Sequence, residues 1–158
     1  MTTSTLITYR LIPHLLAMLS YSQRYFYLAN FSINITNDWR TRDLRTFLTA
    51  LSSRARTGLD VRFLLASPPG IPRLAARNMS YTHYLAALDI PTRFYSGPSV
   101  QHAKFAISDD NSVIIGSHNL TFRSLKSNVE VSILLEDPTL AATLRPVFDH
   151  LWDIAKPS

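Results

Sequence analysis

Cysteine is absent from this sequence, which excludes disulfide bonds, a thiolate metal site and a thiol nucleophile. Charged residues are few, at 17% of the chain against 46% hydrophobic residues, and this balance is typical of a globular chain rather than a disordered one. Internal repeats and low-complexity linkers are also lacking. At 158 residues we therefore expect one domain with a single core, rather than two fused halves.

A long uninterrupted apolar run is missing as well. The apolar segment from Leu6 to Leu19 is broken by Arg10, Pro13 and His14, and it is too short to cross a bilayer as a helix. The residues after it make a poor signal-peptide cleavage site. We expect an amphipathic first helix that packs on a sheet, in a cytoplasmic protein. A secreted or membrane-associated protein, with this segment as a targeting or membrane-surface element, is the alternative.

Basic residues outnumber acidic ones, at 16 against 11, which gives a formal net charge of +5. A basic surface favours polyanionic partners such as nucleic acid or anionic lipid headgroups, but charge alone does not choose between them. A basic protein with no polyanionic partner is the plainer interpretation.

Strand and helix patterns alternate along the chain. Strands are predicted at Arg24 to Ile35, Asp60 to Ala66, Pro91 to Tyr95, Phe105 to Ile107, Ser112 to Ile115 and Val129 to Leu135, and helices at Trp39 to Thr57, Ile71 to Leu88 and Pro138 to Ala155. The order strand, helix, strand, helix, strand implies right-handed parallel crossovers and an α/β sheet.

The residues with the most chemistry gather between Gln101 and Glu130. The two short strands in this stretch are joined by residues 109–111, Asp-Asp-Asn, which suit a hairpin turn. Side chains alternate along an extended segment, so His102 and Lys104 are expected to point to the same side.

The second strand of this hairpin ends at Gly116 and Ser117, and Asn119 follows within reach. If the hairpin forms, an imidazole, an ammonium, a hydroxyl and an amide converge at one end of a sheet. A cation with hydrogen-bond donors suits an anion such as phosphate, and an imidazole suits nucleophilic attack or proton transfer.

The spacing of these residues resembles the HKD motif of the phospholipase D superfamily. The matching pattern is His102-x-Lys104-x4-Asp109-x6-Gly116-Ser117-x-Asn119, and Ser124, Asn128 and Glu130 are similar to the segment that follows the motif in that family. The resemblance covers about thirty residues. It implies an α/β fold with a mixed, largely parallel β-sheet flanked by helices on both faces.

The His-x-Lys pair occurs once in this sequence, at His102 and Lys104. A single copy in a chain of this length resembles the small bacterial endonucleases of the superfamily more than its two-motif lipases. The resemblance therefore implies a single phospholipase D-like nuclease domain over residues 1–158. In the family two HKD motifs meet across a twofold or pseudo-twofold axis, so we expect a homodimer with the active site at the interface.

The family resemblance also implies a role for each motif residue. His102 of one subunit attacks the phosphorus to form a phosphohistidine, and the same histidine of the partner protonates the leaving oxygen and then activates water. Lys104 and Asn119 hold the non-bridging oxygens, and Ser117 adds a hydroxyl donor. Glu130 accepts a hydrogen bond from the other ring nitrogen of His102 and fixes its tautomer. No metal or other cofactor is expected, because lysines and imidazoles supply the positive charge.

Four further residues carry weaker predictions. Asp109 belongs to the predicted catalytic set, with a bracing role at the turn. His118 occupies a free position of the motif, where it either lines the groove or faces solvent. Arg123 and Lys126 lie beside the motif in sequence and are candidates for contacts to flanking phosphates.

Three classes of function remain open from the sequence. The first is a metal-independent nuclease on DNA, RNA or both, with little sequence preference and a steep salt dependence. The second is a lipid phosphodiesterase or phosphatidyl transferase, which requires an apolar entry face. The third is a non-catalytic nucleic-acid-binding accessory subunit. We favour the nuclease, with nucleic acid rather than a membrane as the partner.

Overall fold

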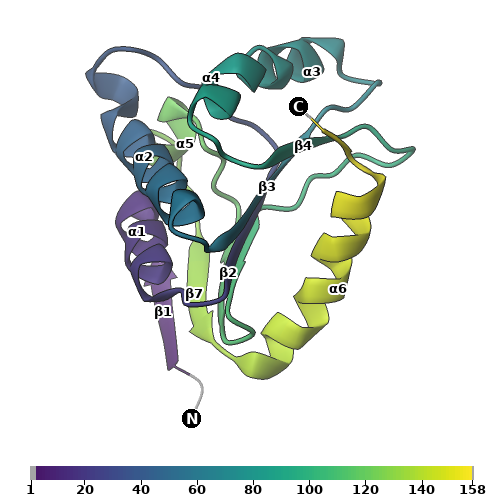
Figure 1. Cartoon of the computed structure of the whole chain (residues 1–158). Coiled ribbons are helices and arrows are strands. Elements are labelled where there is room, and N and C mark those ends of the chain that lie inside the picture. The colour runs from purple at the N-terminus through teal and green to yellow at the C-terminus, as the bar shows by residue number, and fades with distance from the viewer. Residues whose placement is uncertain (1–2, 158) are drawn as a thin grey trace.

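The computed structural model describes residues 3–157, and these form one eight-stranded sheet with helices on both faces (Figure 1). The strands are β1 (Thr3–Ile7), β2 (Tyr25–Asn30), β3 (Asp60–Ala66), β4 (Thr92–Tyr95), β5 (Phe105–Ser108), β6 (Ser112–Gly116), β7 (Ser132–Glu136) and β8 (Lys156–Pro157). The helices are α1 (Leu11–Tyr21), η1 (Trp39–Thr41, a 3₁₀ turn), α2 (Arg42–Arg56), α3 (Pro72–Met79), α4 (Thr82–Ala87), α5 (Phe122–Lys126) and α6 (Pro138–Ile154).

The strands lie side by side in the order β1-β7-β6-β5-β2-β3-β4-β8. Strands β2, β3 and β4 are parallel, since helices cross over between them, while β5, β6 and β7 run antiparallel to their neighbours. The predicted mixed α/β sheet with helices on both faces is confirmed. Its parallel part is smaller than expected, because a turn of three residues between β5 and β6 allows only antiparallel pairing.

Helices α1 and α2 cover one face of the sheet (Figure 1). Helix α2 buries Leu44, Phe47, Leu48 and Leu51, whose spacing places them on one side of the helix. Phe47 meets Phe26 of β2 edge to face, with ring centroids 6.2 Å apart. The amphipathic helix predicted from the sequence is thus confirmed, and it fixes the central strand from this side.

Helix α6 covers the opposite face. It begins at Asp137, whose carboxylate accepts hydrogen bonds from the backbone N–H groups of the first turn at 2.9 and 3.0 Å. Phe148 of α6 stacks on Tyr27 of β2, with centroids 4.8 Å apart, and Arg145 lies 4.7 Å over the same Tyr27 ring. Burial and a hydrogen bond to Asp60 raise the pKa of Tyr27, which keeps its hydroxyl neutral. With helices on both faces, all six residues of β2 are buried.

Two element boundaries differ from the sequence prediction for the same reason, which is side-chain hydrogen bonding to the backbone. The strand expected to reach Ile35 stops at Asn30, because the side chain of Asn78 donates to the Phe31 carbonyl at 2.8 Å and takes the place of a strand partner. The helix expected from Ile71 to Leu88 is two helices, α3 and α4. The side chain of Asn78, near the end of α3, donates to the Ala66 carbonyl at 2.7 Å. Helix α3 ends at Met79, and α4 begins after its N-cap residue Tyr81.

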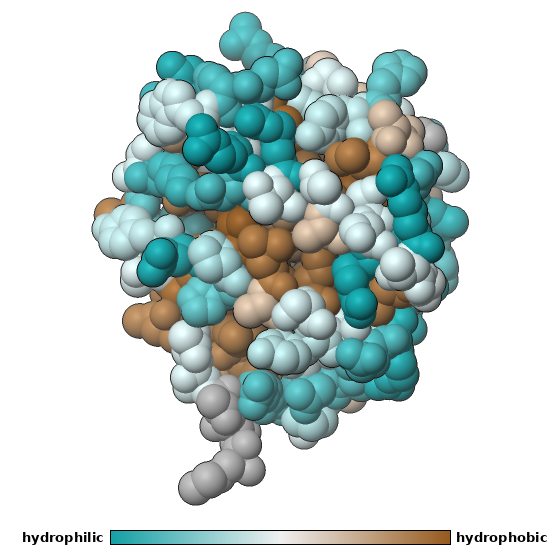
Figure 2. Space-filling view, turned by 60° about the vertical axis from the view of Figure 1, so that its left-hand side comes forward, coloured by the Kyte–Doolittle hydropathy of each residue, from teal (hydrophilic) through white to brown (hydrophobic). Residues whose placement is uncertain are grey.

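Three elements were missed, one of them the two-residue strand β8, which pairs with β4. The edge strand β1 pairs with β7, although its five residues lie within or just before the segment expected to start a helix. The short helix α5 follows the motif directly. None of the helices between residues 3 and 157 has the length and apolar character that a membrane crossing requires. The side of the molecule that carries α1 and α2 shows an apolar area framed by hydrophilic side chains (Figure 2).

Candidate active site

The candidate site lies at the open end of the β5–β6 hairpin. Phe105 pairs with Ile115 at this end, and the turn lies at the other end, where Asp109 and Asp110 adopt left-handed backbone with φ of 54° and 56°. Aspartate tolerates this conformation, as the turn prediction required. The residues just before β5 and just after β6 therefore come together, and the predicted hairpin is confirmed.

An open depression of about 430 Å³ lies at this end of the hairpin. Its lining consists of His102, Ala103, Lys104, Ile115, Gly116, Ser117, Asn119 and Glu130. Five of the residues predicted from the motif thus surround one depression, although they come from three separate segments of the chain.

Lys104 is the cation of the depression. Its ammonium group donates to the backbone carbonyl of His102 at 2.6 Å and lies 3.1 Å from each ring nitrogen of the same residue. The two side chains converge as predicted, although residues 101–104 are not part of a strand. Lys104 is only 8% exposed, and this burial lowers its pKa, an effect that the Glu130 carboxylate partly offsets.

Phe31 positions His102 and Lys104, and this role was not predicted from the sequence. Its ring centroid lies 4.6 Å from that of His102 at an angle of 59°, and 5.0 Å from the Lys104 ammonium. The aromatic ring restricts the imidazole and favours the cation beside it. One signal was available, because Phe31 follows the carboxyl end of the central parallel strand, where α/β sheets bind ligands.

Glu130 lies beside Ser117 rather than His102. The Ser117 hydroxyl donates to the Glu130 carboxylate at 2.5 Å, and the Asn128 amide donates to its other oxygen at 3.1 Å. Burial raises the pKa of Glu130, but hydrogen bonds from Ser117, Asn128 and Ser124 outweigh it, and the pKa is lowered. The predicted hydrogen bond from His102 to Glu130 is absent among residues 3–157, because the nearer hydroxyl and amide occupy the carboxylate.

Asn119 is held by the first turn of α5. Its backbone N–H donates to the Ser124 hydroxyl at 2.7 Å, and Thr121 caps the helix by accepting from the Ser124 N–H. The amide oxygen of Asn119 is buried and has no hydrogen-bond partner within residues 3–157. Ser124, which the motif comparison singled out, is therefore a positioning residue for Asn119.

Gly116 is required by the close approach of β6 and β7 at the rim of the depression. A Cβ atom built there would lie 2.4 Å from both the Cα atom of Ser132 and the carbonyl oxygen of Val131. Any side chain would separate the two strands. The glycine of the motif thus allows Ser117 and Glu130 to reach each other.

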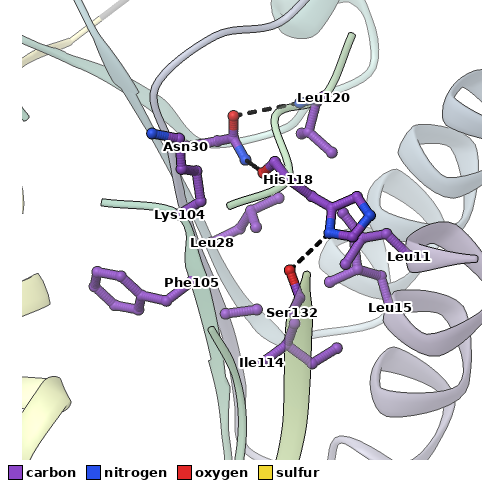
Figure 3. A pocket seen from close by; sticks show the side chains of 11 residues that line it. Leu11, Leu15, Leu28, Asn30, Lys104, Phe105, Ile114, His118, Leu120 and Ser132 are labelled. Atoms are coloured by element: carbon purple, nitrogen blue, oxygen red, sulfur yellow. Dashed lines mark hydrogen bonds between the residues drawn. The ribbon is translucent and has the colours of Figure 1, made fainter. Parts of the chain in front are cut away.

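His118 points away from the depression, contrary to its predicted place in the groove or in solvent. It is 1% exposed, and its imidazole contacts the Ser132 hydroxyl at 2.7 Å (Figure 3). The other ring nitrogen lies 3.0 Å from the Thr8 carbonyl. Burial lowers the pKa of His118, partly offset by the bond to Thr8. The reason is the alternation of side chains after β6, which sends Ser117 outward and the next residue toward α1. In the same view the Asn30 amide bonds to the backbone of residues 118 and 120 (Figure 3).

A family model described as cardiolipin synthase, PLD-like domain, matches residues 15–152, which is most of the chain. The chain belongs to the phospholipase D superfamily. This confirms the resemblance drawn from the HKD motif. Members of this superfamily act on phosphodiesters.

Individual relatives of this phospholipase D superfamily chain are longer proteins. Cardiolipin synthase 1 of Staphylococcus aureus (strain COL) is 29% identical over 111 residues, which are 70% of this chain and 22% of that protein. Cardiolipin synthase B of Shigella flexneri is 29% identical over 132 residues, which are 84% of this chain and 30% of that protein. The chain thus spans less than a third of the length of these relatives.

The fold itself is similar to those of solved structures. The phospholipase D family member Nuc from Salmonella typhimurium superposes with a TM-score of 0.80 at 18% identity, covering 100% of this chain and 99% of that one. NucT from Helicobacter pylori gives a TM-score of 0.77 at 16% identity, with full coverage of both chains. At such identities the likeness describes the fold.

Besides His118, three residues predicted for this phospholipase D superfamily site lie outside the depression. Asp109, placed in the catalytic set, is at the turn end of the hairpin, where its carboxylate accepts from the backbone N–H groups of residues 23, 24 and 25 at 2.6, 2.8 and 3.0 Å. It braces the hairpin against the start of β2, as its weaker role anticipated. Arg123 and Lys126 are exposed on α5, and Lys126 pairs with Asp43 at 2.5 Å. Within residues 3–157 no group of three or more His, Asp or Glu side chains could hold a metal ion.

Proposed function

We propose that this chain is a metal-independent phosphodiesterase, an endonuclease on DNA, RNA or both, whose single domain spans residues 1–158. The observation that carries the proposal is the meeting of His102, Lys104, Ser117 and Asn119 around one open depression. A nucleophilic imidazole, a buried cation and neutral donors are the groups that transfer of a phosphoryl group requires.

The proposed reaction has two steps. In the first, a ring nitrogen of His102 forms a bond to phosphorus while the bond to the leaving oxygen breaks, and that oxygen takes a proton from the partner subunit's His102. In the second, the partner subunit's His102 removes a proton from water, which attacks phosphorus and releases the first imidazole. Lys104 and Asn119 hold the non-bridging oxygens where negative charge increases in the transition state.

In this proposal Glu130 acts through Ser117. The carboxylate accepts the Ser117 hydroxyl, which itself accepts the Val131 N–H at 3.0 Å. Glu130 thereby orients that hydroxyl at the rim of the depression and favours the charged form of Lys104. It is a positioning residue for the site.

The sheet face beside the depression supports a homodimer. Leu6, Ile133 and Ile115 lie opposite one another on adjacent strands and share one face of the sheet, the face on which α6 packs. Leu6 is largely exposed there, as is Val131 in front of β7. An exposed apolar strip on an edge strand is stable when a second copy covers it, and such a copy would bring its own His102 to the depression.

Nucleic acid is favoured as the substrate by charge and shape. The chain carries a net charge of +5, and the depression is open rather than a closed apolar tunnel. An open site that holds the Lys104 cation, on a chain of positive net charge, fits a long polyanion. A second candidate, a lipid phosphodiesterase or phosphatidyl transferase, is favoured by the names of the relatives, which are cardiolipin synthases, and by the exposed apolar side chains of Val129 and Val131 beside Glu130.

The test uses purified protein with EDTA and four labelled substrates: single-stranded DNA, duplex DNA, RNA and phosphatidylcholine. We expect cleavage of nucleic acid that persists in EDTA and falls by about 10³-fold or more in His102→Ala, since the nucleophile is lost. His83→Ala, an exposed histidine on α4, is the matched control and should cleave normally. Turnover of lipid alone would support the second candidate. Inactivity on all four substrates would contradict catalysis.

The shared site is tested by subunit mixing. If one site needs an imidazole from each subunit, an equal mixture of wild-type and His102→Ala protein, allowed to exchange, retains about one quarter of the activity of the same total amount of wild type. Independent sites retain about half. Sedimentation that shows only monomer at micromolar concentration, with activity intact, would refute the homodimer.

A further inference from the structure

Trp39 is a large aromatic side chain that the fold leaves 66% exposed. It opens the 3₁₀ turn η1 and meets Phe122 of α5 edge to face, with ring centroids 5.7 Å apart and planes at 90°. This geometry is the favoured one for an aromatic pair, and it holds the indole in a fixed orientation. Neither residue belongs to the main core clusters, so packing of the core does not account for Trp39.

The loop that carries Trp39 is held by several hydrogen bonds. The Asp38 carboxylate accepts from the Thr36 hydroxyl at 2.7 Å and from the Arg40 N–H at 2.9 Å, and these bonds lower the pKa of Asp38. The Thr41 hydroxyl donates to the Thr36 carbonyl at 2.7 Å, and Arg45 donates to the Asp38 carbonyl at 2.9 Å. An exposed aromatic residue on a loop fixed in this way is preorganised for contact with a ligand.

Basic residues adjoin the aromatic pair in the chain, since Arg40 follows Trp39 and Arg123 follows Phe122. A shallow recess between the start of α1, the η1 turn and α5 is lined by Tyr9, Arg10, Arg40 and Lys126, and also by Asp43, which pairs with Lys126. The segments that meet here carry five cations, Arg10, Arg40, Arg42, Arg123 and Lys126, and two carboxylates, Asp38 and Asp43. We call the surface formed by Tyr9, Arg10, Trp39, Arg40, Phe122 and Lys126 the aromatic–basic patch.

The aromatic–basic patch is built on the same segments as the depression. Phe122 follows Asn119 by three residues, and Ser124 of the same helix holds the Asn119 backbone. The loop that leads to Trp39 is tied to this segment by two backbone bonds, from Leu120 N–H to the Ser32 carbonyl at 3.0 Å and from Asn34 N–H to the Leu120 carbonyl at 2.9 Å. A ligand that reaches from the depression over the start of α5 therefore meets the aromatic–basic patch.

We propose that the aromatic–basic patch binds a single-stranded segment of nucleic acid that flanks the cleaved phosphodiester, with one base stacked on Trp39 and its phosphates near Arg10 and Arg40. This inference rests on the proposed nuclease function and deepens it. An exposed aromatic face accepts any unpaired base, whereas bases inside a duplex are stacked on one another and do not reach it. Alternating aromatic and basic side chains match the alternation of base and phosphate along one strand. The patch thus makes the enzyme prefer single strands.

The kinetic test compares Trp39→Leu with two other variants. Trp39→Phe keeps a stacking ring, and Tyr21→Leu removes another exposed aromatic side chain, at the far end of α1. On a single-stranded oligonucleotide we expect Trp39→Leu to raise KM by about 10-fold, with kcat nearly unchanged, Trp39→Phe to recover most of the loss, and Tyr21→Leu to have no effect. On bis(p-nitrophenyl) phosphate, a small diester without a base, all three variants should match wild type. A KM for the oligonucleotide that Trp39→Leu leaves unchanged would overturn the proposal.

The two substrates separate this proposal from the one on which it rests. If the wild-type protein cleaves nucleic acid and Trp39→Leu has no effect, the nuclease function is supported and the role of the aromatic–basic patch is refuted. Inactivity of wild type toward both the oligonucleotide and the small diester contradicts the nuclease function itself.

Binding can be followed directly, because the chain has two tryptophans and the other, Trp152, is buried. In the His102→Ala background, we expect a single-stranded oligonucleotide to quench the fluorescence of Trp39, and an oligonucleotide of abasic sites to quench it far less. Phosphatidylglycerol vesicles serve as the alternative partner. A blue shift with these vesicles, without quenching by the oligonucleotide, would assign the patch to a membrane surface and overturn the proposal.

Discussion

The Lys104 ammonium lies 3.1 Å from both ring nitrogens of His102, so the two side chains are in direct contact. Burial lowers the pKa of this lysine. The cation and the proposed nucleophile therefore form one unit, held against Phe31, and the protonation of Lys104 is expected to govern the alkaline side of the activity.

The first prediction concerns pH. A lysine with a lowered pKa loses its proton at a lower pH than the ordinary value of about 10.4, so activity should decline on the alkaline side below that pH. Lys104→Arg stays protonated throughout, since the guanidinium pKa is above about 12, and its alkaline decline should move to higher pH even if its maximal rate is lower. The measurement is the pH dependence of kcat/KM for both proteins. An identical alkaline limb in the two would refute the role of Lys104.

The second prediction separates bracing from catalysis at Asp109. Asp109→Ala removes the acceptor of three backbone N–H groups and should lower the free energy of unfolding by about 1.5–3 kcal/mol, while the activity per folded molecule is retained. Urea unfolding and activity at low temperature give both values. Asp153→Ala, an exposed residue of α6, is the matched control. If the Asp109→Ala protein folds but has no activity, Asp109 takes part in catalysis and the bracing role is refuted.

The third prediction tests the close approach at Gly116. Gly116→Ala places a methyl group against the backbone of β7 and should lower the free energy of unfolding by about 1–3 kcal/mol. It should also lower activity, because separation of the strands draws Ser117 away from Glu130. Gly70→Ala, where an added Cβ meets nothing within 4 Å, serves as the control and should leave both quantities unchanged. Equal stability of the two variants would contradict the geometry.

The fourth prediction follows from buried His118. Its pKa is lowered by burial, so below the ordinary value of about 6.5 the unfolded chain binds a proton that the folded chain does not. Stability should therefore fall as the pH drops through 6.5 toward the lowered pKa. His118→Leu should be about 1–2 kcal/mol less stable at pH 7.5, because it leaves Ser132 and Thr8 without a partner, and it should lose this part of the pH dependence. Urea unfolding at pH 7.5, 6.5 and 5.5 measures both effects, and a slope equal to that of wild type would refute this assignment.

Local pattern was enough for much of the fold. Strand β3 was predicted with its observed bounds, and α2 and α6 to within a few residues, because their apolar spacing and caps are local properties. The hairpin around Asp109 was predicted because aspartate tolerates left-handed backbone. Where side chains from distant segments bond to the backbone, as Asn78 does, the boundaries were wrong, since local pattern carries no information about such partners.

The candidate site divides in the same way. The sequence by itself determined that His102, Lys104, Ser117 and Asn119 meet around one depression. They flank a single hairpin, and the two ends of a hairpin lie together whenever its strands are paired. Only the tertiary structure decided the directions and partners of these residues. In the folded chain His118 is buried, and Glu130 accepts a hydrogen bond from Ser117. Phe31 packs against the imidazole of His102, and Trp39 is exposed beside Phe122. Each of these depends on contacts between segments far apart in the chain, and such contacts are fixed by packing rather than by local preference.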